Sequence, residues 1–262
     1  MGILEKKTRI VVKIGSNTLT HDTGKLDLRR MELLVRILSD FKNAGHEIVL
    51  VSSGAVAAGI ARLRLGRRPE STEEKQALAA IGQAELMQVY ENFFATYGYT
   101  VGQMLMTKDI IENPERRTNA QNTFRELLKL GCVPIVNEND PISTEELKFG
   151  GNDTLSAYVA LVCGADLLIN MSDIDGLYDS DPRKNPGAKL IDRVEVIDDT
   201  VISYAGGAGS ERGTGGMITK IKAAQIVTEA GIPMLIVNGK NPEILYRISD
   251  GEHIGTYFAA RR

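Results

Sequence analysis

Hydrophobic residues occur along the chain as short, uninterrupted runs that alternate with longer amphipathic stretches. The uninterrupted runs predict buried strands at residues 9–14, 47–52, 99–106, 132–138, 166–172 and 233–239. The amphipathic stretches predict helices at residues 26–45, 54–66, 73–97, 115–130, 152–164, 217–230 and 241–249. Strands that are apolar throughout and separated by helices are typical of parallel sheets covered on both faces. We therefore expect an α/β fold, a three-layer αβα sandwich with a mainly parallel central sheet.

The segment 173–212 departs from this alternation. It contains Gly, Asp and Pro turns and a single short predicted strand at 189–197, which indicates an inserted hairpin region. We expect one domain over residues 1–262, in which an N-terminal lobe covers about 1–165 and a C-terminal lobe about 166–262.

Composition and charge narrow the class of protein. Hydrophobic residues make up 43% of the chain and charged residues 25%, which is ordinary for a globular protein. With a net charge of -3 and no long Lys or Arg run, we expect no nucleic acid partner. We also expect no membrane partner, since the first apolar run is too short for a signal peptide and no stretch approaches a membrane span. The two cysteines and three histidines do not have the spacing of a metal site. We expect Cys163 to be a buried, inert thiol and the protein to be cytoplasmic.

Small and polar residues follow several of the predicted strands, at the point where each strand ends. The sequences are "KIGSNTLT", "VSSGAVAAG", "NENDPIS" and "MSDIDGLYDSDP", and "FGGNDTLSA" opens the helix at 152–164. Each is weak evidence alone, because Gly-Ser before a helix is usually a cap and "NEND" could be a turn. Ligands bind at the carboxyl ends of strands in open α/β sheets, and glycine-rich loops that lead into helices bind anions. Together the segments predict a site for an anionic ligand.

Two lysines make the predicted anion site more specific. Lys13 ends an apolar strand, where an ammonium without a partner or ligand would cost free energy. Lys220 closes the glycine-rich stretch "GSERGTGGMITK", which is not a P-loop because Lys220 follows Thr219 and not a glycine. The chain has no pattern for a Ser-His-Asp or Cys-His centre and no strand–GxGxxG–helix unit. These features favour phosphoryl transfer, with Mg²⁺ held by nucleotide phosphates and with no protein ligand assigned to the metal.

The motifs "VVKIGSNTLT", "VSSGAVAAG", "VNENDPI", "GGNDTLSA", "SDIDGLYDSDPRKNP" and "GTGGMITK" together resemble the amino acid kinase superfamily. Within it they are most similar to the glutamate 5-kinases, and the resemblance runs over residues 9–258. It implies the carbamate kinase-like form of the αβα fold. It also implies ATP-dependent phosphorylation of the γ-carboxylate of L-glutamate to L-glutamyl 5-phosphate, the first step of proline biosynthesis.

The resemblance implies a role for individual residues. Lys13 and Lys220 would be catalytic by neutralising charge on the transferring phosphoryl group, and Asp153 would hold both lysines. Glutamate would be bound by Ser53, Gly54, Asn137, Asp140 and Asn152. ATP would be bound by Lys13, Gly15, Ser16, Ser172, Asp173, Thr214, Gly215, Gly216, Met217, Ile218, Thr219 and Lys220.

The resemblance also implies partners. They are ATP with Mg²⁺, L-glutamate, proline as a feedback inhibitor, and further copies of the chain in a homodimer or homotetramer. Many glutamate 5-kinases carry a C-terminal PUA-type domain, which this sequence lacks after "GTYFAARR". We therefore expect assembly and proline inhibition to differ from those of the longer enzymes.

Two alternatives remain open at this point. The chain could be another superfamily member, an acetylglutamate, aspartate or UMP kinase, although "GTGGMITK" together with "NEND" argues against these. It could instead be a catalytically silent amino-acid sensor that kept the fold. A sensor would have no use for two phosphate-facing lysines held by Asp153.

Overall fold

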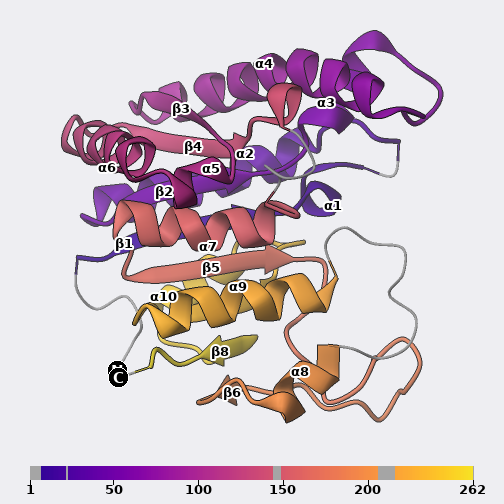
Figure 1. Ribbon diagram of the computed structural model, residues 1–262, viewed down its shortest axis with the longest axis vertical. Coiled ribbons are helices and arrows are strands. Elements are labelled where there is room, and N and C mark those ends of the chain that lie inside the picture. The colour runs from indigo at the N-terminus through magenta and orange to yellow at the C-terminus, as the bar shows by residue number, and fades with distance from the viewer. Residues whose placement is uncertain (1–6, 22, 144–148, 206–215, 262) are drawn as a thin grey trace.

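The computed structural model describes residues 7–21, 23–143, 149–205 and 216–261. Within them, one eight-stranded sheet has the order β3-β4-β2-β1-β5-β7-β8-β6 (Figure 1). Its strands are β1 (Arg9–Ile14), β2 (Glu47–Ser52), β3 (Val101–Met106), β4 (Val133–Glu138), β5 (Leu167–Ser172), β6 (Arg193–Val194), β7 (Met234–Asn238) and β8 (Thr256–Phe258). All of these strand pairs are parallel except β7 with β8.

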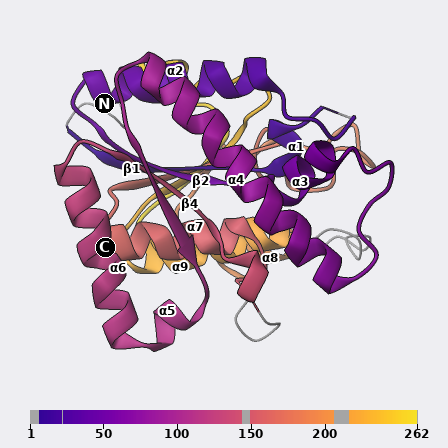
Figure 2. The ribbon, with the colours of Figure 1, turned by 90° about the horizontal axis from the view of Figure 1, so that it is seen from above.

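Helices cover both faces of this sheet. They are α1 (Ser16–Leu19), α2 (Leu28–Asn43), α3 (Ala55–Leu63), α4 (Thr72–Thr96), α5 (Asp109–Glu112), α6 (Pro114–Lys129), α7 (Asn152–Cys163), α8 (Asp199–Ala205), α9 (Met217–Glu229), α10 (Ile244–Ser249) and the 3₁₀ turn η1 (Asp140–Ile142). Figure 2 shows α2 on one side of the sheet and α6, α7 and α9 on the other. The core divides in the same way, into one cluster under α6, α7 and α9 and another under α2, α4 and α10. The predicted three-layer αβα fold with a mainly parallel sheet is confirmed.

Alternation along β1 and β5 decides which face their polar residues reach. Ile10, Val12 and Ile14 belong to the cluster under α2, and Val11 belongs to the cluster under α7 and α9. Since side chains alternate along a strand, Lys13 points toward α7 and α9. Residues of β5 alternate in the same way, and Asn170 lies opposite Lys13 in the β1–β5 register. The two polar side chains therefore lie side by side beneath the same helices.

The strand order reverses at β1. From β1 the chain builds β2, β4 and β3 on one side, then returns to place β5, β7, β8 and β6 on the other. Such a reversal leaves a crevice at the carboxyl ends of the two central strands, which is where open α/β sheets bind ligands. Lys13 of β1 and Ser172 of β5 stand at this edge.

The structure differs from the sequence-based prediction mainly in short elements. The strand expected at 189–197 is only the two-residue β6, although an isolated antiparallel bridge joins Tyr178 to Leu190 nearby. Helices α1, α5 and α8 and strand β8 were not predicted, because three to seven residues are too few to display a periodic pattern. Among the described helices, none combines the length and hydrophobicity needed to cross a membrane.

Two glycines allow α3 and α4 to pack very closely. A Cβ atom added at Gly82 would collide with the backbone carbonyl of Ala55, and one added at Gly59 would collide with that of Leu78. A side chain at either position would therefore force the two helices apart. Further along α4, the Tyr90 hydroxyl lies 2.8 Å from Ser52 Oγ and connects the helix to the end of β2.

Candidate active site

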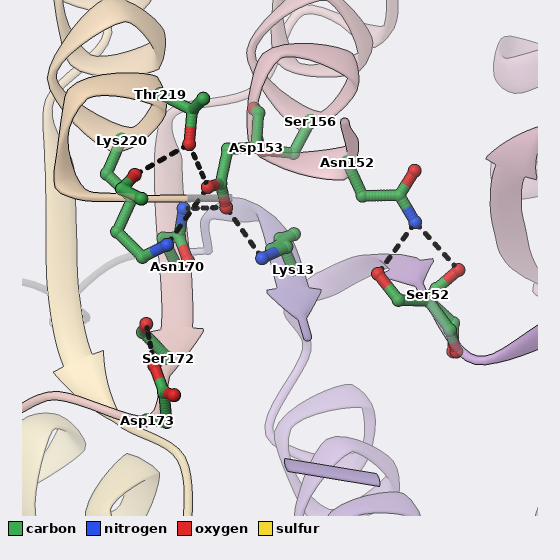
Figure 3. A network of polar contacts seen from close by, with 12 residues as sticks. Lys13, Ser52, Asn152, Asp153, Ser156, Asn170, Ser172, Asp173, Thr219 and Lys220 are labelled. Carbon is green, nitrogen blue, oxygen red and sulfur yellow. Dashed lines mark hydrogen bonds and ion pairs between the residues drawn. The ribbon is translucent and has the colours of Figure 1, made fainter. Parts of the chain in front are cut away.

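Two left-handed glycines position the start of α7. Gly150 and Gly151 have φ values of +79° and +119°, in the region that only glycine adopts without strain. The helix begins directly after them, so Asn152 and Asp153 lie in its first turn. The Asp153 side chain is 3% exposed and points at the ends of β1 and β5 (Figure 3).

The Asp153 carboxylate is the centre of a buried polar cluster. Lys13 Nζ lies 2.6 Å from its Oδ1, and Asn170 Nδ2 donates to the same oxygen at 2.9 Å. Lys220 Nζ lies 3.0 Å from Oδ2, and the Thr219 hydroxyl donates to that oxygen at 2.8 Å. Both carboxylate oxygens thus accept two donors each, which fixes the carboxylate and the two lysines relative to one another (Figure 3).

The charges in this cluster shift the pKa values of its members. Burial by itself would raise the pKa of Asp153, but the charges of Lys13 and Lys220 and the hydrogen bonds from Lys13 and Asn170 outweigh it, so the pKa lies well below its ordinary value. Burial lowers the pKa of Lys13, and the neighbouring Asp153 opposes this effect. The two lysines, 6% and 5% exposed, both contact the Asp153 carboxylate, and the Asp173 carboxylate also interacts electrostatically with each of them. An anion such as a phosphoryl group, placed beside the two ammonium groups, would be attracted by both.

A second group of polar side chains lies beside Asp153. Asn152 Nδ2 lies within hydrogen-bonding distance of the Ser52 carbonyl oxygen (3.1 Å), Ser53 Oγ (2.8 Å) and Asn137 Oδ1 (3.0 Å). Asn137 Nδ2 in turn donates to Gln83 Oε1 at 2.8 Å. A row of amide groups therefore leads from the first turn of α7 to α4.

This row ends at a cavity of about 280 Å³ between α3, α4 and the ends of β3 and β4. Asp140 and Gln83 both line it, together with Ala55. Gly54, with φ of +109°, forms the turn just before Ala55. The residues expected to bind glutamate, Ser53, Gly54, Asn137, Asp140 and Asn152, thus lie in one region of the molecule, around the amide row and its cavity.

The residues expected to bind ATP gather at the ends of β1 and β5. Ser172 Oγ donates to Asp173 Oδ1 at 3.2 Å, and Asn17 Nδ2 of α1 lies 3.4 Å from Asp173 Oδ2. Gly15 and the exposed Ser16 connect β1 to α1 on the same side. The carboxyl end of β5 and the start of α1 therefore meet beside the lysine cluster.

The first turn of α9 contains the remaining described residues that were expected to bind ATP. Gly216 caps the helix, Met217 packs partly buried against the core, and Thr219 and Lys220 contact Asp153. Ile218, between Met217 and Thr219, is 43% exposed. The predictions for Thr214 and Gly215 fall outside the residues that the structure describes.

Comparison with known proteins identifies the family. The amino acid kinase family matches residues 8–238. The glutamate 5-kinase of Clostridium perfringens (strain 13 / Type A) is 51% identical over 263 residues, which cover 99% of this chain and 98% of the relative. That of Clostridium tetani (strain Massachusetts / E88) is 53% identical over 98% of this chain and 96% of the relative. The chain belongs to the glutamate 5-kinases of the amino acid kinase family.

Solved structures agree with this assignment at the level of the fold. The carbamate kinase from Giardia lamblia bound to AMP-PNP aligns with a TM-score of 0.69 over 97% of this chain and 99% of that chain, at 13% identity. The carbamate kinase-like fold expected from the sequence is confirmed for this amino acid kinase.

The sequence-based prediction missed two polar residues of the site. Asn170 is a fully buried amide in the otherwise apolar strand "LLINMS", and Gln83 lies on the buried side of α4. Asn170 could have been found, because a polar residue in an otherwise apolar strand needs a partner. The predicted inert thiol, by contrast, is confirmed: burial raises the pKa of Cys163 to about 12.

We expect the Asn170→Leu substitution to lower kcat of the kinase about tenfold without destabilising the fold. Leucine removes the donor that orients Asp153 Oδ1, so the two lysines lose part of their alignment. It also removes the Asn170 Oδ1 atom, which is buried and has no hydrogen-bond partner among the described residues. Thermal melting should therefore show an unchanged or higher Tm while steady-state kinetics show the loss. An unchanged kcat would contradict this role, and the exposed Asn119→Leu substitution on α6 is the control.

Proposed function

We propose that this chain transfers the γ-phosphoryl group of ATP to the γ-carboxylate of L-glutamate and so forms L-glutamyl 5-phosphate, the first step of proline biosynthesis. The observation that carries the proposal is the pair of buried lysines held by Asp153 at the carboxyl ends of the central strands. Relatives about half identical over nearly the whole chain, named glutamate 5-kinase, support the choice of substrate.

The lysines would act on the charge of the transferring group. Phosphoryl transfer depends mainly on positioning and on neutralising the equatorial oxygens, and Lys13 and Lys220 point ammonium groups at one place from opposite halves of the sheet. The nucleophile needs no general base, because a glutamate carboxylate with a pKa of about 4.3 is ionised at neutral pH. Asp153, already engaged with several donors, would orient the lysines and take no proton.

The two halves of the chain would divide the substrates between them. The N-terminal lobe, about 1–165, would bind glutamate, with the Asp140 carboxylate accepting from the α-ammonium group. The C-terminal lobe, about 166–262, would bind ATP around Ser172, Asp173 and the start of α9. Mg²⁺ would arrive with the nucleotide, because this ion is usually held by substrate phosphates and only one or two carboxylates.

Several further features belong to the same proposal. Proline would compete as a feedback inhibitor, since it shares the α-amino and α-carboxylate groups of glutamate. Assembly into a homodimer or homotetramer is proposed from the family. A cytoplasmic location fits two free cysteines, Cys132 and Cys163, which reducing conditions would preserve.

The purified chain should form glutamyl hydroxamate when it is given ATP, Mg²⁺, L-glutamate and hydroxylamine. Hydroxylamine traps an acyl phosphate, so the assay detects the proposed product directly. Parallel reactions with acetylglutamate, aspartate and UMP, the last followed by ADP release, separate this activity from those of other amino acid kinases. Product with one of these and none with glutamate would contradict the proposed substrate. Glutamate binding without any ATP-dependent product would indicate an amino-acid sensor.

A further inference from the structure

Gln83 presents a hydrogen-bond donor for which the described protein has no acceptor. Its side chain is 7% exposed, and Nε2 is buried with no hydrogen-bond partner among the described residues. The residue lines the cavity of about 280 Å³ described above, near the lower end of the range for small-molecule pockets, about 300–1,000 Å³. Buried amide groups are nearly always paired, so an unpaired one in a residue that lines a cavity requires an explanation.

The neighbouring hydrogen bonds establish that the unpaired atom is the nitrogen. The Glu138 backbone N–H donates to Asn137 Oδ1 at 2.9 Å, which makes that atom an oxygen and the other amide atom of Asn137 the nitrogen. Asn137 Nδ2 must then donate, and the atom 2.8 Å away on Gln83 must be an oxygen. Rotating either amide would place donor against donor. The free position of Gln83 is therefore an N–H group.

The other residues that line the cavity indicate which chemical groups a ligand would carry. Glu138 Oε1 accepts from Ser143 Oγ at 3.3 Å and from the Phe149 backbone N–H at 3.1 Å, so this carboxylate is oriented by the protein. Asp140 adds a second carboxylate to the cavity lining. A ligand that carries both an acceptor and a cation matches this lining, and an α-amino acid has both groups on one carbon atom.

We propose that Gln83 is a specificity-determining residue that donates from Nε2 to the α-carboxylate of the amino-acid substrate. This inference rests on the proposed function. The amide row runs from Asn152, next to Asp153, through Asn137 to Gln83, so Gln83 marks the end of the row farthest from the lysines. A substrate whose γ-carboxylate meets the phosphoryl group at the lysines extends along this row. Its α-carbon end then reaches Gln83 and Asp140.

The test compares two substrates on two variants in the hydroxamate assay. Gln83→Met keeps the length of the side chain and removes both the donor and the acceptor of Asn137 Nδ2. KM for L-glutamate should therefore rise about tenfold or more with kcat and KM for ATP unchanged. Gln83→Glu keeps the acceptor for Asn137 but sets a carboxylate against the α-carboxylate. It should therefore lower the ratio of kcat/KM for L-glutamate to kcat/KM for L-glutamic acid α-amide by about tenfold, since the α-amide can donate to the new carboxylate.

The control is Gln88→Met, which makes the same change at an exposed glutamine on the same helix and should leave every constant unchanged. If Gln83→Glu leaves the ratio of the two kcat/KM values unchanged, the inference is overturned. It is also overturned if Gln88→Met raises KM for L-glutamate as much as Gln83→Met does. If Gln83→Met fails to fold in a melting experiment, the substrate ratio of Gln83→Glu decides the question. A wild-type chain with no glutamate-dependent product would contradict the proposed function and this inference with it, whereas an active wild type with an unchanged ratio contradicts this inference alone.

Discussion

The Lys220→Ala substitution should lower kcat for glutamyl phosphate formation by about 10³-fold and leave KM for L-glutamate nearly unchanged. Lys220 contacts Asp153 from the first turn of α9, on the side of the cluster opposite Lys13. Its charge would stabilise the phosphoryl group most strongly in the transition state, so its loss affects the chemical step and not glutamate binding. Steady-state kinetics with hydroxylamine trapping, at saturating ATP, measure both constants.

The fold should survive this substitution, because Asp153 keeps the Lys13 ammonium as its counter-charge. Lys222→Ala is the matched control: this lysine lies two residues further along α9, is exposed, and should be replaceable without effect. A rise in KM for glutamate with an unchanged kcat would show that Lys220 serves substrate binding instead. An equal loss in Lys222→Ala would show that the effect comes from the charge of the helix in general.

The Asp153→Asn substitution should reduce the free energy of unfolding at neutral pH by about 3–5 kcal/mol and abolish measurable activity. It keeps the size of the side chain but removes the negative charge that the buried Lys13 and Lys220 both contact. Urea denaturation of the two proteins measures the difference. Asp250→Asn, at an exposed aspartate after α10, should cause almost no change.

The difference in free energy of unfolding between wild type and Asp153→Asn should become smaller as the pH falls. The pKa of Asp153 in the folded chain lies below the ordinary value of 3.8, so between the two values the unfolded chain binds the proton more tightly. The contribution to stability is therefore complete above 3.8 and is lost as the pH falls below it toward the folded-state pKa. The gap between wild type and Asp153→Asn should narrow in acid. A gap that is the same at neutral and acidic pH would mean that the ionised carboxylate is not its source.

The fold was largely predictable because its central elements have long, clear patterns. Strands β1, β2, β4, β5 and β7 are nearly uninterrupted apolar runs, and each was predicted within two residues of its bounds. The far edge of the sheet was less predictable, because β6 and β8 have two and three residues and depend on neighbouring strands for their pairing. Tertiary context decides such short elements, and local sequence carries little of that information.

The candidate site was predictable where a residue broke a strong local pattern at a strand end. Lys13 satisfied this condition by itself, Lys220 was noted at the end of a glycine-rich stretch, and the family resemblance supplied Asp153. Gln83 broke no such pattern, because it occurs in the middle of a helix in which polar residues are common. Only the packing of α3 on α4 shows that it faces the core. Nor could the sequence show that its nitrogen lacks a partner, since that depends on the orientation of two other amides.

The close contact of α3 with α4 also limits how the cavity beside these helices can change. Alanine is the smallest possible replacement for Gly59 or Gly82, and even its single methyl group would collide with backbone atoms that cannot move aside alone. The spacing of α3 and α4 therefore cannot change through a single substitution at either glycine. A tolerated substitution there would have to move one whole helix relative to the other, and Gln83 lies on one of them. Lineages that acquire a different substrate are then expected to alter the cavity through its other walls, β3 and the residues around Asp140, while these two helices remain a conserved unit.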